Sequence, residues 1–249
     1  MLGLYEKYYW QIGFKTRFYD WLIPESYFES MRQVLALLPD KDGLNIWDVG
    51  CGSGMLLKFF KKKFSSGLVY YGSDLLFDGL KRVKMRAKNL KISSTVICFQ
   101  SDMVGATPFA ENTIDIVIAH FSIYTISDFD KRVNTLKYLY RALKPNGMLI
   151  MVCPSKNYNS GKIIKESFKL LRISRGYFAA MIKRIFVYPL TRTLGLNFIQ
   201  RQLKSGNWVA SSKEDLSDEI GRAGFEVGTA TSVYAGGAYL IHGIKKSEL

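Results

Sequence analysis

The sequence predicts an α/β fold: a doubly wound, seven-stranded, mostly parallel sheet with helices inserted after its fifth strand. Three observations support this prediction. From residue 40 onward, short apolar runs alternate with helix-compatible segments. The runs at 114–119 and 148–152 are almost continuously apolar, which is typical of parallel strands buried on both faces. The connections are short, so successive strands and helices must pack as neighbours in βαβ units.

Each expected element has a local reason. Pro24 suits the first position of a helix, and Pro39 closes that helix. The pair Gly236-Gly237 separates two strands of a closing antiparallel hairpin. In chain order, we expect helices at 4–20 and 25–38, a strand at 44–49, a helix at 54–63, a strand at 68–74, a helix at 76–89, strands at 95–100 and 114–121, a helix at 128–143, a strand at 148–153, a helix at 212–223, and strands at 225–232 and 238–244.

The chain of 249 residues suits a single domain, 1–249. Within it we expect an N-terminal helical segment, 1–40, and a basic helical cap inserted at 156–205. The sequence has no apolar run of about 18 residues and no signal-peptide layout at its start, so we expect a cytoplasmic protein. Its three cysteines lack C-x-x-C spacing, which predicts free thiols.

A glycine-rich turn follows the first expected strand. Residues 48–54 read Asp-Val-Gly-Cys-Gly-Ser-Gly and lead into an apolar, helix-compatible stretch. The spacing differs from the G-x-G-x-x-G of dinucleotide binders, and no Lys follows to hold a phosphate. An acid beside such a turn suits a ligand with a cationic amino group. The turn therefore points to S-adenosylmethionine (SAM).

Polar residues also end the next three expected strands. Asp74 ends the second strand, Asp102 follows the third, and His120 lies near the end of the fourth. In open α/β sheets, ligands bind at the carboxyl ends of the strands. An acid about twenty residues beyond the glycine turn can accept hydrogen bonds from both ribose hydroxyls. These residues therefore belong to one expected site.

Four segments in order carry a resemblance to class I SAM-dependent methyltransferases of the small-molecule, quinone/sterol-like type. The segments are WDVGCGSG at 47–54, SDLLFDGL at 73–80, the stretch 101–128 with its TPF and IDIVIAHF sequences, and LKPNGMLIMV at 143–152. The resemblance covers roughly residues 44–153 and, more weakly, 212–246. It implies the Rossmann-like fold of these enzymes, with S-adenosylhomocysteine as a product.

The resemblance also implies where SAM lies. The three glycines line its methionyl part, Asp48 supports its ammonium group, and Asp74 takes the ribose hydroxyls. Asp102 and the backbone of Met103 take the adenine. The candidate cofactor-binding residues are Asp48, Gly50, Cys51, Gly52, Gly54, Asp74, Leu75, Asp102, Met103 and His120.

His120 and Tyr124 are the candidate catalytic residues. The sulfonium of SAM is already an activated electrophile, so alignment of the acceptor and exclusion of water can drive transfer. A base is needed only for a phenol, hydroxyl or carbon acid. We expect His120 to pack or contact the cofactor rather than act as a base. Tyr124 stands where many members of the family carry His.

Positive charge is concentrated in one segment. The net charge is +14, and residues 156–204 contain eleven Lys and Arg against one acid, Glu166. One interpretation is a cap whose apolar stripe covers the site while Lys183 and Arg184 face water. A second is docking on an anionic membrane surface. Nucleic-acid binding is disfavoured, because no recognised RNA-binding appendage is present. The expected inward stripe comprises Phe178, Met181, Ile182 and Ile185.

The leading function is transfer of a methyl group from SAM to a small, fairly apolar acceptor, including a lipid-linked one. Two alternatives stay open: an RNA- or protein-directed SAM methyltransferase, and a catalytically idle SAM-binding module. No metal site is expected. The sequence does not indicate an oligomeric state.

Overall fold

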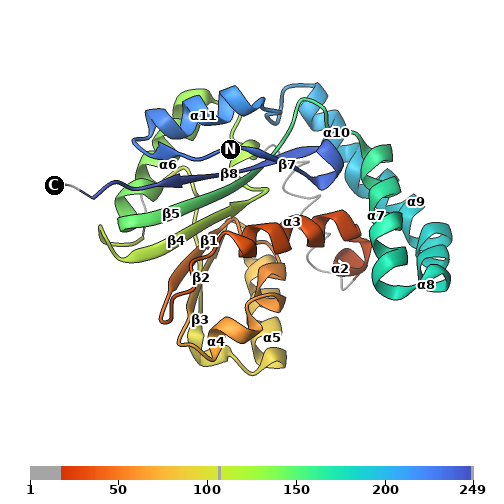
Figure 1. Cartoon of the computed structure of the whole chain (residues 1–249), viewed down its shortest axis with the longest axis horizontal. Coiled ribbons are helices and arrows are strands. Elements are labelled where there is room, and N and C mark those ends of the chain that lie inside the picture. The colour runs from red at the N-terminus through yellow and green to blue at the C-terminus, as the bar shows by residue number, and fades with distance from the viewer. Residues whose placement is uncertain (1–17, 106–107, 248–249) are drawn as a thin grey trace.

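A mostly parallel sheet forms the centre of the molecule, as the computed structural model describes it for residues 18–105 and 108–247 (Figure 1). The strand order is β3-β2-β1-β4-β5-β8-β6, and β7 also pairs with β8. β1 to β5 are parallel, and β8 runs antiparallel to β5. The strands are β1 Asn45–Val49, β2 Val69–Asp74, β3 Val96–Gln100, β4 Ile114–His120, β5 Leu143–Pro154, β6 Glu226–Val227, β7 Thr231–Val233 and β8 Ala238–Ile244. The predicted fold class is confirmed.

The predicted strand 225–232 is broken in two, so the described chain has eight strands and not seven. β6 and β7 lie on the side of β8 that faces away from β5. Three residues, 228–230, separate β6 from β7, whereas two residues of β8 lie opposite them, and this extra residue is a bulge. A Cβ on Gly228 would lie 2.2 Å from the His242 ring. The bare glycine backbone leaves room for this imidazole.

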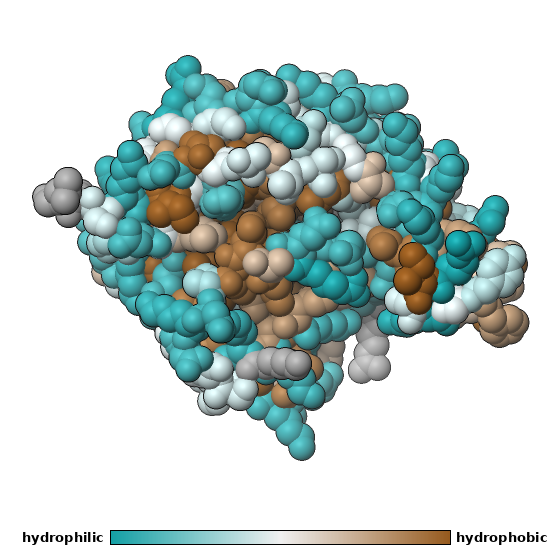
Figure 2. Space-filling model, in the orientation of Figure 1, coloured by the Kyte–Doolittle hydropathy of each residue, from teal (hydrophilic) through white to brown (hydrophobic). Residues whose placement is uncertain are grey.

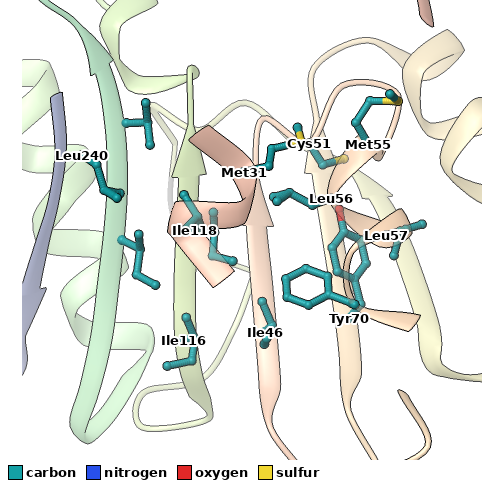
Figure 3. Packing of buried hydrophobic residues seen from close by; sticks show 14 of the residues in the cluster. Met31, Ile46, Cys51, Met55, Leu56, Leu57, Tyr70, Ile116, Ile118 and Leu240 are labelled. Atoms are coloured by element: carbon teal, nitrogen blue, oxygen red, sulfur yellow. The ribbon is translucent and has the colours of Figure 1, made fainter. Parts of the chain in front are cut away.

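Helices cover both faces of the sheet, as in a doubly wound fold. α3 (Glu25–Ala36) and α5 (Phe77–Leu90) pack with the core side chains on one face, and α6 (Phe129–Ala142) and α11 (Lys213–Arg222) pack on the other. Figure 3 shows Ile46, Ile116 and Ile118 of neighbouring strands on the same side as Met31 of α3. The side chains of successive strand residues therefore pack into the cores on opposite faces of the sheet, which explains the almost continuous apolar runs.

The predicted helix 54–63 is wrong. In its place lie a 3₁₀ turn, η1 (Met55–Lys58), and one turn of helix, α4 (Lys61–Phe64). Met55, Leu56, Leu57 and Phe60 are all buried. A single α-helix lying on a sheet buries one stripe of its surface and cannot turn three consecutive side chains inward. Most of the predicted helix 4–20 lies outside the described residues, and α2 (Phe18–Leu22) is its described end.

A group of helices follows β5 and stands beside α3 (Figure 1). Asn159 caps the first of them, since its side chain accepts the Lys162 N–H, and Gly176 ends it at φ +84°. Ser167 bonds this helix to Ser26 of α3 through its hydroxyl, 2.8 Å between the two oxygens. The helices are α7 Ser160–Arg175, α8 Tyr177–Ile182, the π-helical turn η4 Lys183–Val187, α9 Tyr188–Leu190, the π-helical turn η5 Thr191–Leu196 and α10 Asn197–Lys204.

The predicted orientation of α8 and η4 is wrong. Phe178 is 80% exposed, and Ile182 and Ile185 are also exposed, so the stripe expected to face inward faces solvent. Lys183, expected in water, turns inward, with its Nζ 3.3 Å from the Ile23 carbonyl oxygen and 3.8 Å from a Glu25 carboxylate oxygen. The physical reason lies in the other side chains of the segment: Ala180, Val187 and Tyr188 are those buried against the protein. No helix in residues 18–105 or 108–247 is long and apolar enough to cross a membrane.

One buried ion pair joins the helices of the second face and yields a stability prediction. Arg132 of α6 donates from Nη2 and Nε to one carboxylate oxygen of Glu219 on α11, at 2.7 and 3.1 Å. Both residues are buried. Glu219→Ala should lower the free energy of unfolding by about 3–5 kcal/mol, because an uncompensated guanidinium stays buried. Urea unfolding measures this difference.

Asp218 supplies the matched control. It lies one residue away on α11 and pairs with Arg222 at the surface, 2.7 Å between Nε and Oδ2. Asp218→Ala should cost less than about 1 kcal/mol, since exposed pairs contribute little. Equal losses for the two variants would contradict the role given to the buried pair.

Candidate active site

The glycine turn after β1 is held by the end of β2. Gly50, Gly52 and Gly54 have φ values of +69°, +53° and +69°, in the left-handed region that glycine adopts without strain. The N–H groups of Gly50 and Cys51 both donate to the Ser73 carbonyl, at 2.8 and 3.0 Å. The Gly52 N–H donates to the Asp74 carboxylate at 2.8 Å. These N–H groups are committed within the protein, so the turn is not a phosphate cradle.

Gly50 also meets a steric limit. A Cβ at this position would lie 2.5 Å from the Cβ of Ser122 and 3.3 Å from the Met103 methyl group. Real Cβ atoms do not approach so closely, and the φ value already disfavours any side chain. The Ser122 hydroxyl is buried, and no described group pairs with it. A polar atom of this kind suits a site that a polar ligand enters.

Asp74 presents a carboxylate that pairs with no cation among the residues that the structure describes. Its Oδ2 accepts the Gly52 N–H and its Oδ1 accepts the Leu76 N–H, both at 2.8 Å. Burial raises the pKa of this carboxyl above its ordinary value, although the two backbone hydrogen bonds oppose the shift. A carboxylate has about four acceptor positions, so two remain for a ligand. A vicinal diol would supply two hydroxyl donors for these two acceptor positions.

Asp48, on β1, is the second carboxyl of the site, and unlike Asp74 it is fully buried. It accepts a hydrogen bond from the Tyr70 hydroxyl at 2.5 Å. Burial raises its pKa to about 7; the Tyr70 hydrogen bond opposes this shift, and the charge of Asp74 adds to it. A bound cation would restore the charged form at a lower pH. The two carboxyls of Asp48 and Asp74 therefore fit a ligand with both an ammonium group and a diol, as SAM has.

The third acid is more exposed. Asp102 follows β3, and its Oδ1 accepts the Val104 N–H at 3.0 Å. Leu75 is 36% exposed at the end of β2, whereas Cys51 is buried, with its Sγ 3.1 Å from a Cβ placed on Gly72. Since β1, β2 and β3 are neighbours, their ends place the predicted cofactor residues along one edge of the sheet. The sequence order alone predicts this juxtaposition.

His120 is held in a defined tautomer. Its Nε2 lies 2.9 Å from the Ser30 hydroxyl oxygen, and that hydroxyl donates its only hydrogen to the Tyr27 carbonyl at 2.8 Å. Ser30 must therefore accept a hydrogen bond from His120, so Nε2 carries the proton and Nδ1 keeps its lone pair. Nδ1 is buried, and no described group pairs with it. Burial lowers the pKa of His120 to about 3, so the ring is neutral at physiological pH.

Aromatic rings surround this histidine. The Tyr27 ring of α3 lies 4.8 Å from His120 and 5.5 Å from Phe121, and Tyr234 lies 5.1 Å from Phe121, measured between ring centroids. Phe121 and Tyr234 have φ values of +55° and +56°. Left-handed backbone in bulky residues is uncommon and gathers at functional sites. We call Tyr27, Phe121 and Tyr234 the aromatic wall.

Tyr124 lies beyond this wall. It belongs to η3 (Ile123–Thr125) and is buried, with its ring 5.4 Å from Trp208 and 6.4 Å from Phe121. A pocket of about 470 Å³ opens on the other side of Trp208, between the end of β5 and α10. Lys156, Tyr158 and Lys204 are among its lining residues. Tyr158 connects it to the aromatic wall, 6.2 Å from Tyr234 between ring centroids.

An ion-pair cluster joins α2 to the glycine turn. Asp20 accepts hydrogen bonds from Arg82 and Arg86 of α5, at 3.1 and 2.8 Å, and from the Ser53 hydroxyl at 3.2 Å. Burial opposes ionisation of Asp20, but the two guanidinium groups lower its pKa overall. The sequence analysis missed this cluster, together with Tyr27, Ser30, Ser122 and Tyr234. Its members lie far apart in the chain, and only the Arg82/Arg86 spacing on one helix face is visible in the sequence.

Across the parts of the chain that the structure describes, no set of three His, Cys, Asp or Glu side chains is arranged to hold a metal ion. The polar groups at the strand ends are the buried carboxyl of Asp48, the partly buried carboxyl of Asp74, a serine hydroxyl and a neutral imidazole.

The chain is similar to known methyltransferases. Residues 47–151 match the family described as "Methyltransferase domain". A demethylmenaquinone methyltransferase of Lactococcus lactis is 26% identical over 84% of this chain and 76% of its own length. A ubiquinone/menaquinone biosynthesis C-methyltransferase, UbiE, of Pseudoalteromonas translucida is 25% identical over 86% of this chain and 79% of its own.

Solved structures agree on the fold. A SAM-dependent methyltransferase of Aquifex aeolicus superposes with a TM-score of 0.59 at 17% identity, over 86% of this chain and 89% of its own. Another from Methanosarcina mazei gives 0.56 at 16% identity, over 87% and 98%. The strand order, the glycine turn with its two acids and the match over residues 47–151 lead to one conclusion. The chain is a class I SAM-dependent methyltransferase of the small-molecule type.

Proposed function

We propose that the protein transfers the methyl group of SAM to a small, largely apolar acceptor that carries a ring hydroxyl, including a lipid-linked one. The aromatic wall beside the buried His120 is the observation that carries this proposal. Flat aromatic rings favour stacking with an aromatic acceptor, and the His120 imidazole beside them can bind a hydroxyl. The names of the two relatives, both quinone-pathway methyltransferases, support the same acceptor class.

In this proposal, SAM supplies an electrophilic methyl group on its sulfonium. Asp74 uses its two free acceptor positions for the ribose hydroxyls, and Asp48 stabilises the ammonium group. Gly50, Gly52 and Gly54 line the methionyl part, with the Ser122 hydroxyl as a further polar contact. Cys51 shapes the turn by packing against Gly72. Leu75, Asp102 and Met103 surround the adenine.

His120 has a positioning role in this proposal. Its Nδ1 lone pair can accept a hydrogen bond from the acceptor hydroxyl, and Ser30 holds the required tautomer. A pKa of about 3 makes the ring a poor proton acceptor, since a general base works best with a pKa near the working pH. His120 therefore orients the hydroxyl and so the reacting ring, while the proton that the acceptor loses on methylation passes to water and not to the imidazole. Tyr124 supports Phe121 through the contact between their two rings.

A lipid-linked acceptor lies at a membrane. The proposal therefore includes peripheral contact with an anionic membrane from the cytoplasmic side, with the acceptor entering the site beside α3. The positive net charge of +14 suits such a surface.

Replacement of Asp74 tests the cofactor assignment. Asp74→Ala removes the charge-assisted hydrogen bonds to the diol, so SAM affinity should fall about ten- to hundredfold. Isothermal calorimetry measures this. Asp78→Ala is the matched control, because Asp78 lies four residues further on and pairs with the exposed Lys81, 3.3 Å away. Unchanged affinity in a folded Asp74→Ala protein would remove Asp74 from the site.

The pKa of Asp48 predicts a pH dependence of SAM binding. Only the ionised carboxyl attracts an ammonium group, so SAM affinity should fall as the pH drops below about 7. Asp48→Asn should bind SAM more weakly and lose this dependence. Calorimetry between about pH 5.5 and 7.5 checks both expectations. A dependence that persists in the variant would assign the titration to another group.

The same carboxyl predicts an opposite effect on stability. Its folded pKa of about 7 exceeds the value of about 3.9 in an unfolded chain, so the folded state binds the extra proton between these values. Stability without ligand should therefore fall as the pH rises through about 7. Asp48→Asn should raise the melting temperature at about pH 8, where the buried charge costs most. A lower melting temperature of the variant at that pH would show that the charge is already compensated.

Formation of S-adenosylhomocysteine tests the acceptor class. Product should form with a hydroxylated aromatic ring bearing an apolar chain, such as a demethylated quinol, and not with RNA or protein. His120→Ala should raise the KM for this acceptor about tenfold or more, because one hydrogen bond in an apolar site is lost, and should leave SAM affinity unchanged. Ser30→Ala should raise the KM less. Product with RNA or protein alone would overturn the proposal.

A further inference from the structure

The helices inserted after β5 present an apolar surface to solvent. Fifteen large hydrophobic side chains are exposed in the described residues, and eight of them fall between residues 173 and 194, so the exposure is concentrated in one short segment. We call these eight the outer face: Ile173, Tyr177, Phe178, Ile182, Ile185, Phe186, Leu190 and Leu194. Single exposed hydrophobic residues are ordinary, but a contiguous group of aromatic and branched side chains marks an interaction surface.

The charges within the segment that carries the outer face have one sign. The sequence contains no Asp or Glu between Glu166 and Glu214. Arg172, Arg175 and Arg184 are exposed within or beside the outer face. In Figure 2 the end of the molecule formed by these helices shows brown surface directly beside teal surface. Aromatic and aliphatic side chains bordered by arginines are typical of helices that lie in the surface layer of an anionic membrane.

The orientation of the segment strengthens this argument. Lys183 is turned inward to the Ile23 carbonyl and Glu25, while Phe178 and Phe186, at 80% and 64% exposure, are turned outward. Lys183 is partly desolvated there, and burial lowers its pKa. A helix that only covered the active site would be expected to bury the two phenylalanines and expose the lysine. The outward phenylalanines and the inward lysine suit a helix surface that contacts an apolar medium.

A second copy of the chain fits this surface poorly. Two outer faces in contact would bring the arginines of both copies together without a carboxylate between them, and like charges at an interface cost several kcal/mol. An anionic lipid surface offers both required features, a layer that accepts apolar side chains and phosphates that pair with arginine.

We propose that the outer face docks on the surface of an anionic phospholipid bilayer, with Phe178 and Phe186 inserted among the lipid headgroups and the arginines paired with phosphate. This names the surface used for the membrane contact and rests on the proposed function only for its purpose, the capture of a lipid-linked acceptor. α7 follows β5 and bonds to α3 through Ser167 and Ser26, one residue before Tyr27 of the aromatic wall. Docking therefore brings the acceptor side of the protein toward the bilayer.

Vesicle co-sedimentation of the full chain tests the proposal without any acceptor. Binding should be strong to vesicles of equal parts phosphatidylcholine and phosphatidylglycerol and weak to phosphatidylcholine alone. It should weaken as salt rises, because exposed charges are then screened. Phe178→Ser with Phe186→Ser should weaken partitioning at least about tenfold. Arg172→Gln with Arg175→Gln and Arg184→Gln should weaken it roughly a hundredfold at low salt.

Matched controls lie outside the inserted helices. Met85→Ser with Ile97→Ser removes two apolar side chains of 41% and 47% exposure, and Lys84→Gln with Lys88→Gln and Lys91→Gln removes the same charge as the triple arginine variant. Both controls should bind vesicles like the unaltered protein. SAM affinity, measured for every variant, reports on folding, and the two outer-face variants test the surface independently of each other.

Two results would overturn the proposal. One is equal binding to neutral and anionic vesicles at low salt. The other is anionic-vesicle binding that the outer-face variants leave unchanged or that the control variants reduce equally. Vesicle binding without methyl transfer would support the docking surface and contradict the proposed acceptor, so the two failures are distinguishable.

Discussion

The site depends on the hydrogen bonds between the end of β2 and the glycine turn after β1. The Ser73 carbonyl accepts two N–H groups of the turn, and the Asp74 carboxylate accepts a third. These bonds commit the N–H groups of Gly50, Cys51 and Gly52 within the protein, so these three groups are not available to a phosphate. A ligand at this edge meets carboxylates instead. The carboxylates at this edge suit an ammonium group and a diol.

This arrangement has a cost in stability. Asp48 lies close enough to Asp74 for the charge of Asp74 to raise the Asp48 pKa, and neither carboxyl has a cationic partner among the described residues. Asp115 shows the contrast, because Lys144 and Lys41 pair with it, 2.8 and 3.4 Å away, and lower its pKa despite burial. Unpaired buried carboxyls persist where a ligand compensates them. A positively charged ligand would compensate the negative charges of Asp48 and Asp74 in the folded protein.

The local sequence pattern was sufficient to predict the sheet and the position of the acids at the strand ends. Asp48 and Asp74 each lie at the end of an apolar run, and parallel strands bring such ends to one edge. The aromatic wall could not be predicted in this way, since Tyr27 and Tyr234 reach Phe121 from helices separated by two hundred residues. The role of Ser30 likewise could not be predicted from the sequence, because it depends on the hydrogen bond between Ser30 and His120.

The errors have local physical causes. The stretch after Gly54 has the composition of a helix, but its consecutive buried side chains require a tighter turn. In the inserted helices, the periodicity correctly groups Phe178 with Ile182 and Ile185 but cannot say which side faces the protein. Packing of Ala180 and Tyr188 decides the side. The edge strand breaks at Gly228, where the His242 ring lies against the backbone.

α3 connects these parts. On consecutive turns of this helix, Ser26 bonds to the inserted helices, Tyr27 contributes to the aromatic wall, and Ser30 sets the tautomer of His120. A crystal structure with S-adenosylhomocysteine tests the central claim most directly. We predict the ribose hydroxyls on Asp74, the ammonium group nearest Asp48, and the sulfur facing His120 and the aromatic wall. A ligand bound away from the glycine turn, or with its sulfur facing away from His120, would contradict this account.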